Sequence, residues 1–320
     1  MRHLYKILLL FLMCFLQKNL YAQVYTNPVI PTLNDTITIF FQANLGSGGL
    51  ENYDGDVYMH TGVITSESQN TSDWKYVVTE WDENLEQLKM QRDSNDPNLY
   101  SLKIGTITEF YDIDDALDII KLAMVFRSED GTLEGKGSNF TDIFIPIIKD
   151  GIHVKFENQL DLETRIISTT EVIEIKVASR SLDNPLERID LIVNDVIIQS
   201  TDQDNLVYEF SGNTTGFFQF MAISYDSEMK SDTSYANIIV AEQINEPSPN
   251  NIEEGINYHD DPDKVTLKLL APYKESIYVI GDFNQWQIRP EYQMKRDYVS
   301  DSEIYWWLEL DNLDTDTEYS

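Results

Sequence analysis

From Val24 onward the chain is a succession of short apolar or alternating segments separated by Asn, Asp, Gly and Ser. These segments are rich in β-branched and aromatic residues and bounded by turn formers, which is typical of strands in antiparallel sandwiches. In the first part of the chain we expect one short helix within Ile113–Ile120 and strands at residues 36–41, 57–64, 75–81, 99–104, 121–126 and 142–147. Residues 23–148 are therefore predicted to form one all-β domain.

A second series of strand-like segments begins at Ile152. It continues at residues 172–177, 189–193, 196–198, 206–210, 217–225 and 235–240. Their spacing of roughly ten residues is the rhythm of an immunoglobulin-like sandwich. The Cys and Trp core of antibody domains is absent, so the spacing predicts the architecture alone. We place this immunoglobulin-like domain at residues 150–242.

The composition then changes to an acidic segment rich in Pro and Asn, which predicts a linker at residues 243–263. Residues 264–320 resume the strand pattern at 265–270, 277–280 and 305–310. Short sheets of this size are marginal on their own, so we expect an incomplete sandwich that continues beyond Ser320. The predicted fold class is a tandem of immunoglobulin-like β-sandwiches with the last one truncated.

The first 22 residues have the layout of a secretory signal peptide. Arg2 and Lys6 precede the apolar run Ile7–Leu16, and a short polar stretch ends at Ala22. Spanning a bilayer takes about 20 apolar residues in a helix, so a cleaved signal fits better than the alternative, a retained anchor. We expect cleavage after Ala22 and a secreted or cell-surface protein with no stable membrane span.

Charge and cysteine content restrict the partners further. The single cysteine, Cys14, leaves with the signal, so no disulfide is expected. Without residues 1–22 the chain has 20 basic and 55 acidic residues, a net charge of −35. This balance argues against nucleic acid or an anionic membrane as partner, because phosphate binding needs clustered Lys and Arg. A neutral polysaccharide remains compatible with it.

Catalytic groups are scarce. The three remaining histidines, His60, His153 and His259, fall in separate domains or linkers, and the sequence has no phosphate-binding loop and no paired-histidine metal spacing. The acidic run at residues 112–118 lacks the Gly and the Glu that a calcium loop requires at its sixth and twelfth positions. We therefore expect no catalytic residue, no metal site and no cofactor within the chain.

The tryptophans carry the candidate binding chemistry, because sugars stack their C–H faces on flat rings. Trp286 follows a strand and a turn, where a large ring has little structural reason to be. Trp306 and Trp307 are neighbours in a predicted strand and must face opposite sides. We take Trp286 and Trp307 as candidate carbohydrate-binding residues, with core packing as the alternative for each. For Trp74 and Trp81 the pattern is compatible with a side chain that faces the core and with one that faces solvent.

Two stretches resemble a known family. Ser276–Trp286, which contains Gly-Asp-Phe-Asn-Gln-Trp, and Tyr305–Trp307 resemble the amino-terminal β-sandwich of alpha-amylase family glycoside hydrolases, a module related to glycogen-binding domains. Residues 56–65, 73–75, 121–127 and 130–136 are similar to the front domain of secreted amylase-like proteins of Bacteroidetes type. The middle domain matches only as a generic sandwich.

The resemblance implies a parent glycosidase that acts on starch-like alpha-glucans with two carboxylates. Its catalytic residues would belong to a (β/α)8 barrel beyond Ser320, so none is carried over, and Trp286 is the position that matches a sugar-stacking residue. The chain is then the non-catalytic front of a secreted hydrolase, with alpha-glucan and the barrel of the same polypeptide as partners. The alternative is an extracellular glycan-binding or adhesion protein made of immunoglobulin-like modules without catalysis.

Overall fold

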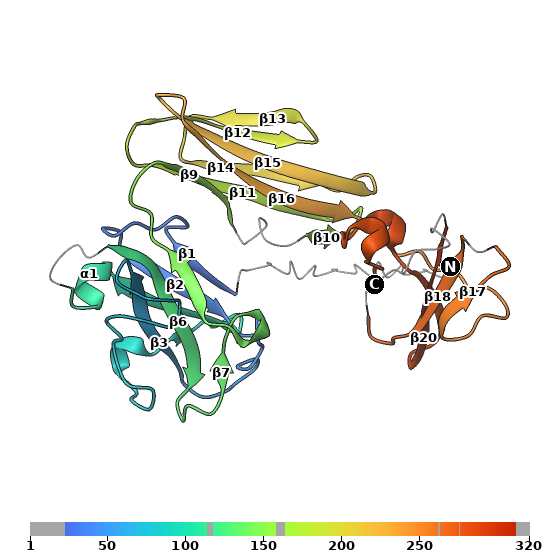
Figure 1. Ribbon diagram of the computed structural model, residues 1–320, viewed down its shortest axis with the longest axis horizontal. Coiled ribbons are helices and arrows are strands. Elements are labelled where there is room, and N and C mark those ends of the chain that lie inside the picture. Colours follow the sequence, from blue (N-terminus) through green and yellow to red (C-terminus); the bar gives the residue numbers. More distant parts are fainter. Residues whose placement is uncertain (1–22, 114–117, 158–163, 262, 275, 312–320) are drawn as a thin grey trace, which may run out of the picture.

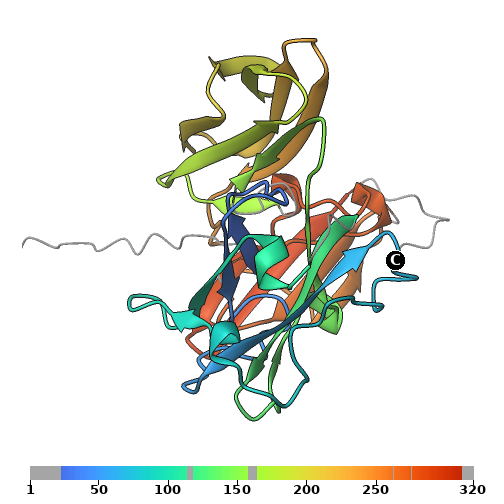
Figure 2. The ribbon, with the colours of Figure 1, turned by 90° about the vertical axis from the view of Figure 1, so that its left-hand side faces the viewer.

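The computed structural model describes residues 23–113, 118–157, 164–261, 263–274 and 276–311. Within these residues the chain is almost entirely β and forms five sheets. The sheets make up three domains that follow one another along the chain, and the second lies above the first in Figures 1 and 2. The predicted all-β, multi-sandwich fold class is confirmed.

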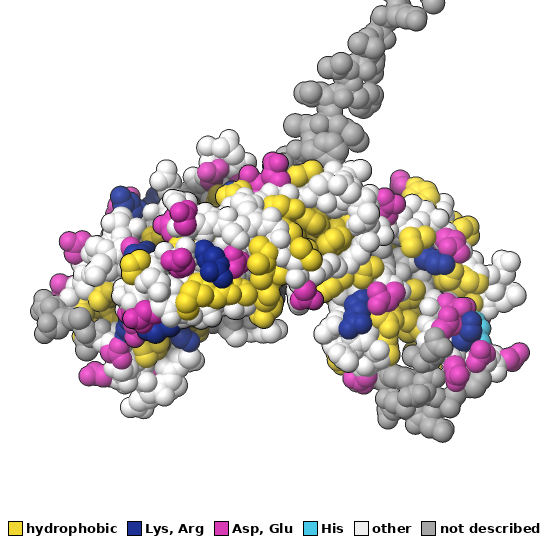
Figure 3. Space-filling view, turned by 90° about the horizontal axis from the view of Figure 1, so that it is seen from above, with side chains coloured by type: hydrophobic (Ala, Val, Ile, Leu, Met, Phe, Trp, Pro, Cys, Tyr) yellow, Lys and Arg dark blue, Asp and Glu magenta, His cyan; other side chains and the backbone are white. Residues whose placement is uncertain are grey.

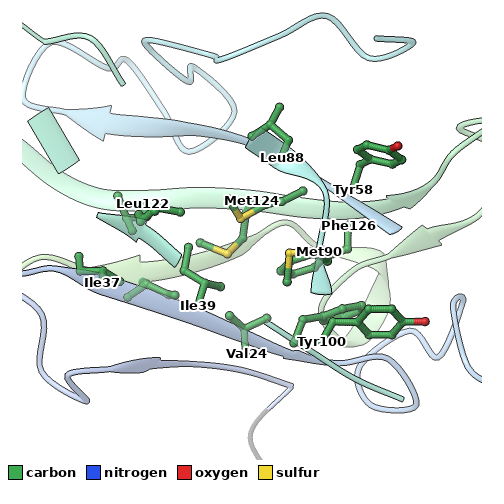
Figure 4. Packing of buried hydrophobic residues seen from close by; sticks show 14 of the residues in the cluster. Val24, Ile37, Ile39, Tyr58, Leu88, Met90, Tyr100, Leu122, Met124 and Phe126 are labelled. Carbon is green, nitrogen blue, oxygen red and sulfur yellow. The ribbon is translucent and has the colours of Figure 1, made fainter. Parts of the chain in front are cut away.

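The first domain consists of two four-stranded sheets. Its strands are β1 (Val24–Asn27), β2 (Ile37–Gln42), β3 (Val57–Thr65), β4 (Gln91–Arg92), β5 (Leu99–Gly105), β6 (Ile119–Ser128), β7 (Glu134–Gly135) and β8 (Ile143–Pro146). One sheet has the order β1-β2-β5-β4, and in the other β6 pairs with β3, β7 and β8. A single apolar core lies between them (Figure 4).

Alternation along the strands explains this core. Ile37 and Ile39 of β2 point toward Leu122 and Met124 of β6, and all four are inaccessible to solvent (Figure 4). Nearby, the rings of Phe41 and Phe126 stack at a centroid distance of 3.9 Å. Because period-two patterning buries one face of each strand, two such sheets close over a shared interior.

Two local predictions for the first domain differ from the structure. Residues 75–81 form no strand, and Lys75 makes only an isolated bridge to Val63. The short helix, α1, lies earlier than expected, at Ile107–Phe110. Part of the expected helix, residues 114–117, lies outside the described residues, and Ile119 already belongs to β6. Short 3-10 turns occur at η1 (Glu86–Leu88) and η2 (Ser138–Phe140).

The second domain is a sandwich of a three-stranded and a five-stranded sheet, with orders β14-β11-β9 and β10-β16-β15-β12-β13. Its strands are β9 (Ile152–Phe156), β10 (Arg165–Ile167), β11 (Val172–Ser181), β12 (Leu186–Val193), β13 (Val196–Thr201), β14 (Asn205–Ser211), β15 (Gly216–Asp226) and β16 (Ser231–Val240). Phe156, Phe210 and Phe220 fill the space between the sheets. Asn194 and Asp195 both have positive φ, which suits the two-residue turn joining β12 to β13.

The first and second domains are bonded to each other. Arg180 on β11 makes a bidentate ion pair with Asp35, with both N–O distances 2.9 Å. Asp35 also accepts hydrogen bonds from the backbone and hydroxyl of Thr32. This ion pair joins β11 of the second domain to the segment that precedes β2 in the first.

The third domain has one four-stranded sheet of order β17-β18-β20-β19. The strands are β17 (Gly255–Tyr258), β18 (Val265–Leu270), β19 (Lys295–Ser300) and β20 (Glu303–Leu310), with 3-10 turns η4 (Asp282–Asn284) and η5 (Pro290–Tyr292). Trp306 is fully buried in its core and donates its indole N–H to the carbonyl of Ala271. Residues 277–280, expected as a strand, make one bridge, between Tyr278 and Gln293.

The segment expected as a linker is bonded to the third domain over much of its length. Asn245 forms a parallel bridge with Arg296 of β19, and Ser248 donates two hydrogen bonds to Asp297. Farther along, β17 pairs with β18. We call residues 244–248 the docked segment. It adds a short edge to the sheet beside β19.

The described surface carries the acidic character of the sequence. Acidic side chains are scattered over the face seen in Figure 3, with fewer basic ones among them and apolar side chains gathered over its middle. No helix in the described part of the chain is long and apolar enough to cross a membrane. Residues 1–22 lie outside the described residues, so the signal peptide stays a prediction.

Candidate functional site

Two places in the described chain present tryptophan to solvent together with polar groups. The first is a hollow on the outer face of the first domain, lined by His60, Ser72, Trp74, Trp81, Val125, Glu134, Lys136 and Asp142, which we call the aromatic cleft. The second is the turn at residues 281–286 in the third domain, which we call the Trp286 turn.

The floor of the aromatic cleft comes from β3 and β6. His60 and Val125 are direct cross-strand partners, and both line the hollow. Their neighbours Met59 and Met124 are fully buried in the core. Because successive side chains in a strand face opposite sides, His60 and Val125 lie on the outer face of the sheet.

A glycine lets the wall of the cleft approach this sheet. Lys75 exchanges two backbone hydrogen bonds with Val63, at 2.8 and 2.9 Å, so the segment after Ser72 lies directly beside β3. A Cβ at Gly62 would lie 2.9 Å from the carbonyl oxygen of Lys75 and 3.3 Å from the Cβ of Trp74. Gly62 therefore makes room for the backbone that positions Trp74.

Both cleft indoles are held in place. The ring of Trp74 stacks on His60 at a centroid distance of 5.8 Å, and its N–H donates to the carbonyl of Thr71. Trp81 meets the same imidazole edge-on at 5.1 Å. The guanidinium of Arg127 lies 5.9 Å from the centroid of Trp81. The rings thus share His60 between them.

Arg127 is the buried support of this arrangement, with only 1 % of its surface exposed. Its guanidinium donates to the carbonyl of Glu83 at 2.6 Å and to the side-chain carbonyl of Asn84 at 2.8 Å. It also lies over the ring of Tyr58. The segment bearing Trp81 is therefore tied to β6 through one side chain.

The electrostatics of the aromatic cleft are mixed and nearly balanced. Burial lowers the pKa of His60, and the positive charge of Arg127 lowers it further, so the imidazole is neutral at pH 7. Its Nδ1 atom is buried without a hydrogen-bond partner. Lys136 and Glu134 form an ion pair at 3.0 Å, and Asp142 adds one negative charge.

The cleft is small and open to solvent. Its volume is about 250 Å³, and an adjoining polar hollow of about 400 Å³, lined by Gln69, Asn70, Asp73 and Lys75, shares Ser72 with it. Pockets that enclose drug-sized ligands measure roughly 300–1,000 Å³. The two hollows together therefore suit an extended ligand that lies along the surface, not a compact ligand that the protein encloses.

The Trp286 turn is fixed from below by one asparagine. Asn284 is 3 % exposed, accepts the backbone N–H of Gly281 at 2.9 Å and donates to the carbonyl of Val279 at 2.9 Å. Gln285 and Trp286 both adopt left-handed backbone conformations, with φ of 57° and 58°. The resulting turn directs Trp286 away from the core.

The ring of Trp286 is 54 % exposed, and its N–H donates to the carboxylate of Asp282 at 2.9 Å. Trp307, the other candidate from the sequence, is 5 % exposed and lies elsewhere in the domain. Its N–H donates to the carbonyl of Glu246 in the docked segment, and Lys295 lies 4.4 Å above its ring. As placed, Trp307 offers no ring face to a sugar, because packing against the docked segment covers it.

Sequence reasoning missed His60, Trp74 and Trp81 as a group, since nothing in the local pattern shows which side of the segment either indole takes. The available signal was Gly62, an isolated glycine inside a strand of bulky residues, which indicates a close backbone approach. His60, His153 and His259 lie apart, and the latter two bond to Asp150 and Thr266. Across the described ranges, no three His, Cys, Asp or Glu side chains come together as metal ligands.

A scan against protein-family models and a search of curated proteins give no match for this sequence. Among solved structures, the fibronectin(III)-like modules of CbhA from Clostridium thermocellum are 20 % identical, with a TM-score of 0.24 over 28 % of this chain and 96 % of that one. The eight amino-terminal Ig domains of Down Syndrome Cell Adhesion Molecule are 10 % identical, with a TM-score of 0.23 over 81 % and 33 %.

Dimeric latent PorU from Porphyromonas gingivalis is 9 % identical, with a TM-score of 0.23 over 93 % of this chain and 30 % of that one. At such identities and TM-scores these likenesses carry no conclusion about this chain. Its β-sandwich class rests on its own sheets and their order.

Proposed function

We propose that this chain is the non-catalytic accessory region of an exported protein that acts on starch-like alpha-glucans, and that the Trp286 turn contacts the glucan. The observation that carries the proposal is the exposed, hydrogen-bonded indole of Trp286 on a turn fixed by the buried Asn284. This is the position that matches a sugar-stacking residue in the resemblance to alpha-amylase family modules.

The geometry of the turn suits stacking. An indole face binds the C–H face of a sugar ring, and a ring already fixed in its bound orientation loses less conformational entropy on binding. Asp282 fixes the plane of Trp286, and its carboxylate lies beside the ring where it is able to accept a sugar hydroxyl. The domain thus offers one flat apolar face with an adjacent acceptor.

Export and a catalytic partner belong to the same proposal. The basic, apolar and small-residue pattern of residues 1–22 supports secretion, and the resemblance supports a hydrolytic barrel in the same polypeptide. In that role the accessory domains hold glucan near the barrel and raise its effective concentration.

The direct test is native electrophoresis of residues 23–320 in gels with and without soluble starch. We expect starch to retard the wild type and Trp286→Ala to lose most of that retardation. Tyr258→Ala is the matched control, because Tyr258 is 80 % exposed in the same domain but lies on β17. Equal retardation of the wild type and Trp286→Ala would contradict the role of Trp286.

A second candidate, a glycan-binding or adhesion array without catalysis, is favoured by the bonded junction of the first two domains. The Arg180–Asp35 ion pair ties these domains to each other, which suits display of a binding surface. Release of reducing ends from soluble starch by the whole encoded protein separates the two candidates. Activity supports the hydrolase, and its absence supports the array.

A further inference from the structure

We infer that the aromatic cleft of the first domain is a second, separate binding site, and that its ligand is a neutral polysaccharide whose sugar ring stacks on the indoles of Trp74 and Trp81. The inference does not depend on the Trp286 turn, which lies in another domain. It rests on the geometry, charge and extent of the cleft.

The rings of Trp74 and Trp81 are presented to the hollow. Trp74 and Trp81 are half-buried rather than buried, and both line the hollow. The indole N–H groups donate to backbone carbonyls, of Thr71 and Gly131 respectively. Core packing alone does not call for two indoles around one imidazole on the outer face of a sheet. A fixed aromatic surface beside hydrogen-bonding groups is what recognition of a sugar ring requires.

The charges of the residues that line the cleft nearly cancel. His60 is neutral, and the charges of Glu134 and Lys136 offset each other in an ion pair, so only Asp142 is left without a counter-charge among the lining residues. Carboxylates accept and ammonium groups donate hydrogen bonds to hydroxyl groups. The site therefore offers both partners to a neutral polyol and no net attraction to an anion.

The cleft continues into the neighbouring hollow through Ser72, which lines both. That hollow is lined by the amides Gln69 and Asn70 and by the paired Asp73 and Lys75. Amide and hydroxyl groups along a surface path suit the repeated hydroxyls of a sugar chain. We therefore place one stacked ring in the aromatic cleft and the next units along residues 69–75.

The experiment is fluorine NMR of residues 23–320 labelled with 5-fluorotryptophan. After removal of residues 1–22 the chain has five tryptophans, two in the first domain and three in the third, and Trp→Phe substitutions assign each signal. Soluble starch, xylan and laminarin are titrated separately. We expect at least one of them to shift the signals of Trp74 and Trp81 and to leave that of the buried Trp306 unchanged.

Affinity for that glycan should fall about tenfold in Trp74→Ala, with partial recovery in Trp74→Tyr, because a flat ring is restored. Trp286→Ala should leave the first-domain shifts intact. Shifts at Trp286 alone would overturn the cleft inference and leave the proposed function standing. Shifts at Trp74 and Trp81 alone would do the reverse. Shifts with heparin but none with the three neutral glycans would also overturn the inference.

Discussion

The aromatic cleft and the Trp286 turn expose tryptophan in two different ways. In the first domain, two half-buried indoles lie on a sheet face and depend on contacts from β3, β6 and the segment after Ser72. In the third domain, one indole stands 54 % exposed on a six-residue turn whose key support, Asn284, is two residues away. The comparison shows that a local turn and a long-range assembly present an indole to solvent by different routes and to different extents.

The difference has a consequence for robustness. A ring positioned by its own turn keeps its surroundings when distant residues change, whereas a ring positioned by sheet packing responds to any change in the support beneath it. Fluorotryptophan signals report the two regions separately, because the first domain holds Trp74 and Trp81 and the third holds the other three. The following changes test the comparison.

The largest effect is expected from Arg127→Ala. Removing this buried side chain leaves the carbonyl groups of Glu83 and Asn84 without their donor and empties the space beneath Trp81. We expect a loss of about 3 kcal/mol in the free energy of unfolding of the first domain. Urea unfolding followed by the Trp74 and Trp81 signals measures it. Lys230→Ala, which removes an exposed ion pair, is the control and should change little.

Asn284→Ala is the counterpart in the third domain. The substitution removes two hydrogen bonds from a buried site, to Gly281 and Val279, and should cost about 2 kcal/mol. The Trp286 signal should sharpen toward that of a mobile ring, while the signals of Trp74 and Trp81 stay unchanged. A change in the first-domain signals would contradict the independence of the two regions.

Gly62→Ala tests the close approach under the cleft. The added methyl group meets the carbonyl oxygen of Lys75 at 2.9 Å, so either β3 or the neighbouring segment must shift. We expect a cost of about 1.5 kcal/mol and a displaced Trp74 signal. An unchanged Trp74 signal would show that the segment does not need this space.

Acid should weaken the first domain through His60. Burial first, and then the charge of Arg127, lower the pKa of His60 in the folded state below the unfolded value of about 6.5. As the pH falls, the unfolded state therefore takes up a proton at a higher pH than the folded state does. Stability is complete above the unfolded pKa and declines as the pH falls toward the lower, folded pKa. Urea unfolding at several pH values should show this decline in the wild type and a smaller one in His60→Phe.

The smallest effect is expected from Asp282→Ala. It removes the acceptor of the Trp286 N–H at an exposed position, which should cost about 0.5 kcal/mol. The third domain should unfold at nearly the same urea concentration, but starch should retard the variant less than the wild type. If starch retarded Asp282→Ala as much as the wild type, the Trp286 ring would bind starch without needing Asp282 to fix its plane.

Hydrophobic alternation was enough to predict the sandwich class and most core strands, because each strand buries one face whatever its neighbours are. It failed where pairing depends on distant partners. Residues 75–81 look like a strand but make a single bridge, and the charged β19 gives little apolar signal yet pairs along β20. Local sequence does not encode either outcome.

The tryptophans show the same limit. Alternation places Trp306 and Trp307 on opposite faces, as the structure has them, with Trp306 in the core. The cover over Trp307 comes from Glu246, 61 residues earlier in the chain, which no local pattern reveals. The exposure of Trp286 was predictable because its support, Asn284, is local.

The docked segment also determines where a fragment that contains the third domain should begin. A fragment that starts at β17 would lack residues 244–248 and would leave the indole of Trp307 and the edge of β19 open to solvent. Exposed apolar rings and unpaired edges promote self-association. A boundary placed ahead of Ile244 keeps that edge covered, so the third domain, as a unit for expression, begins about ten residues before its first strand.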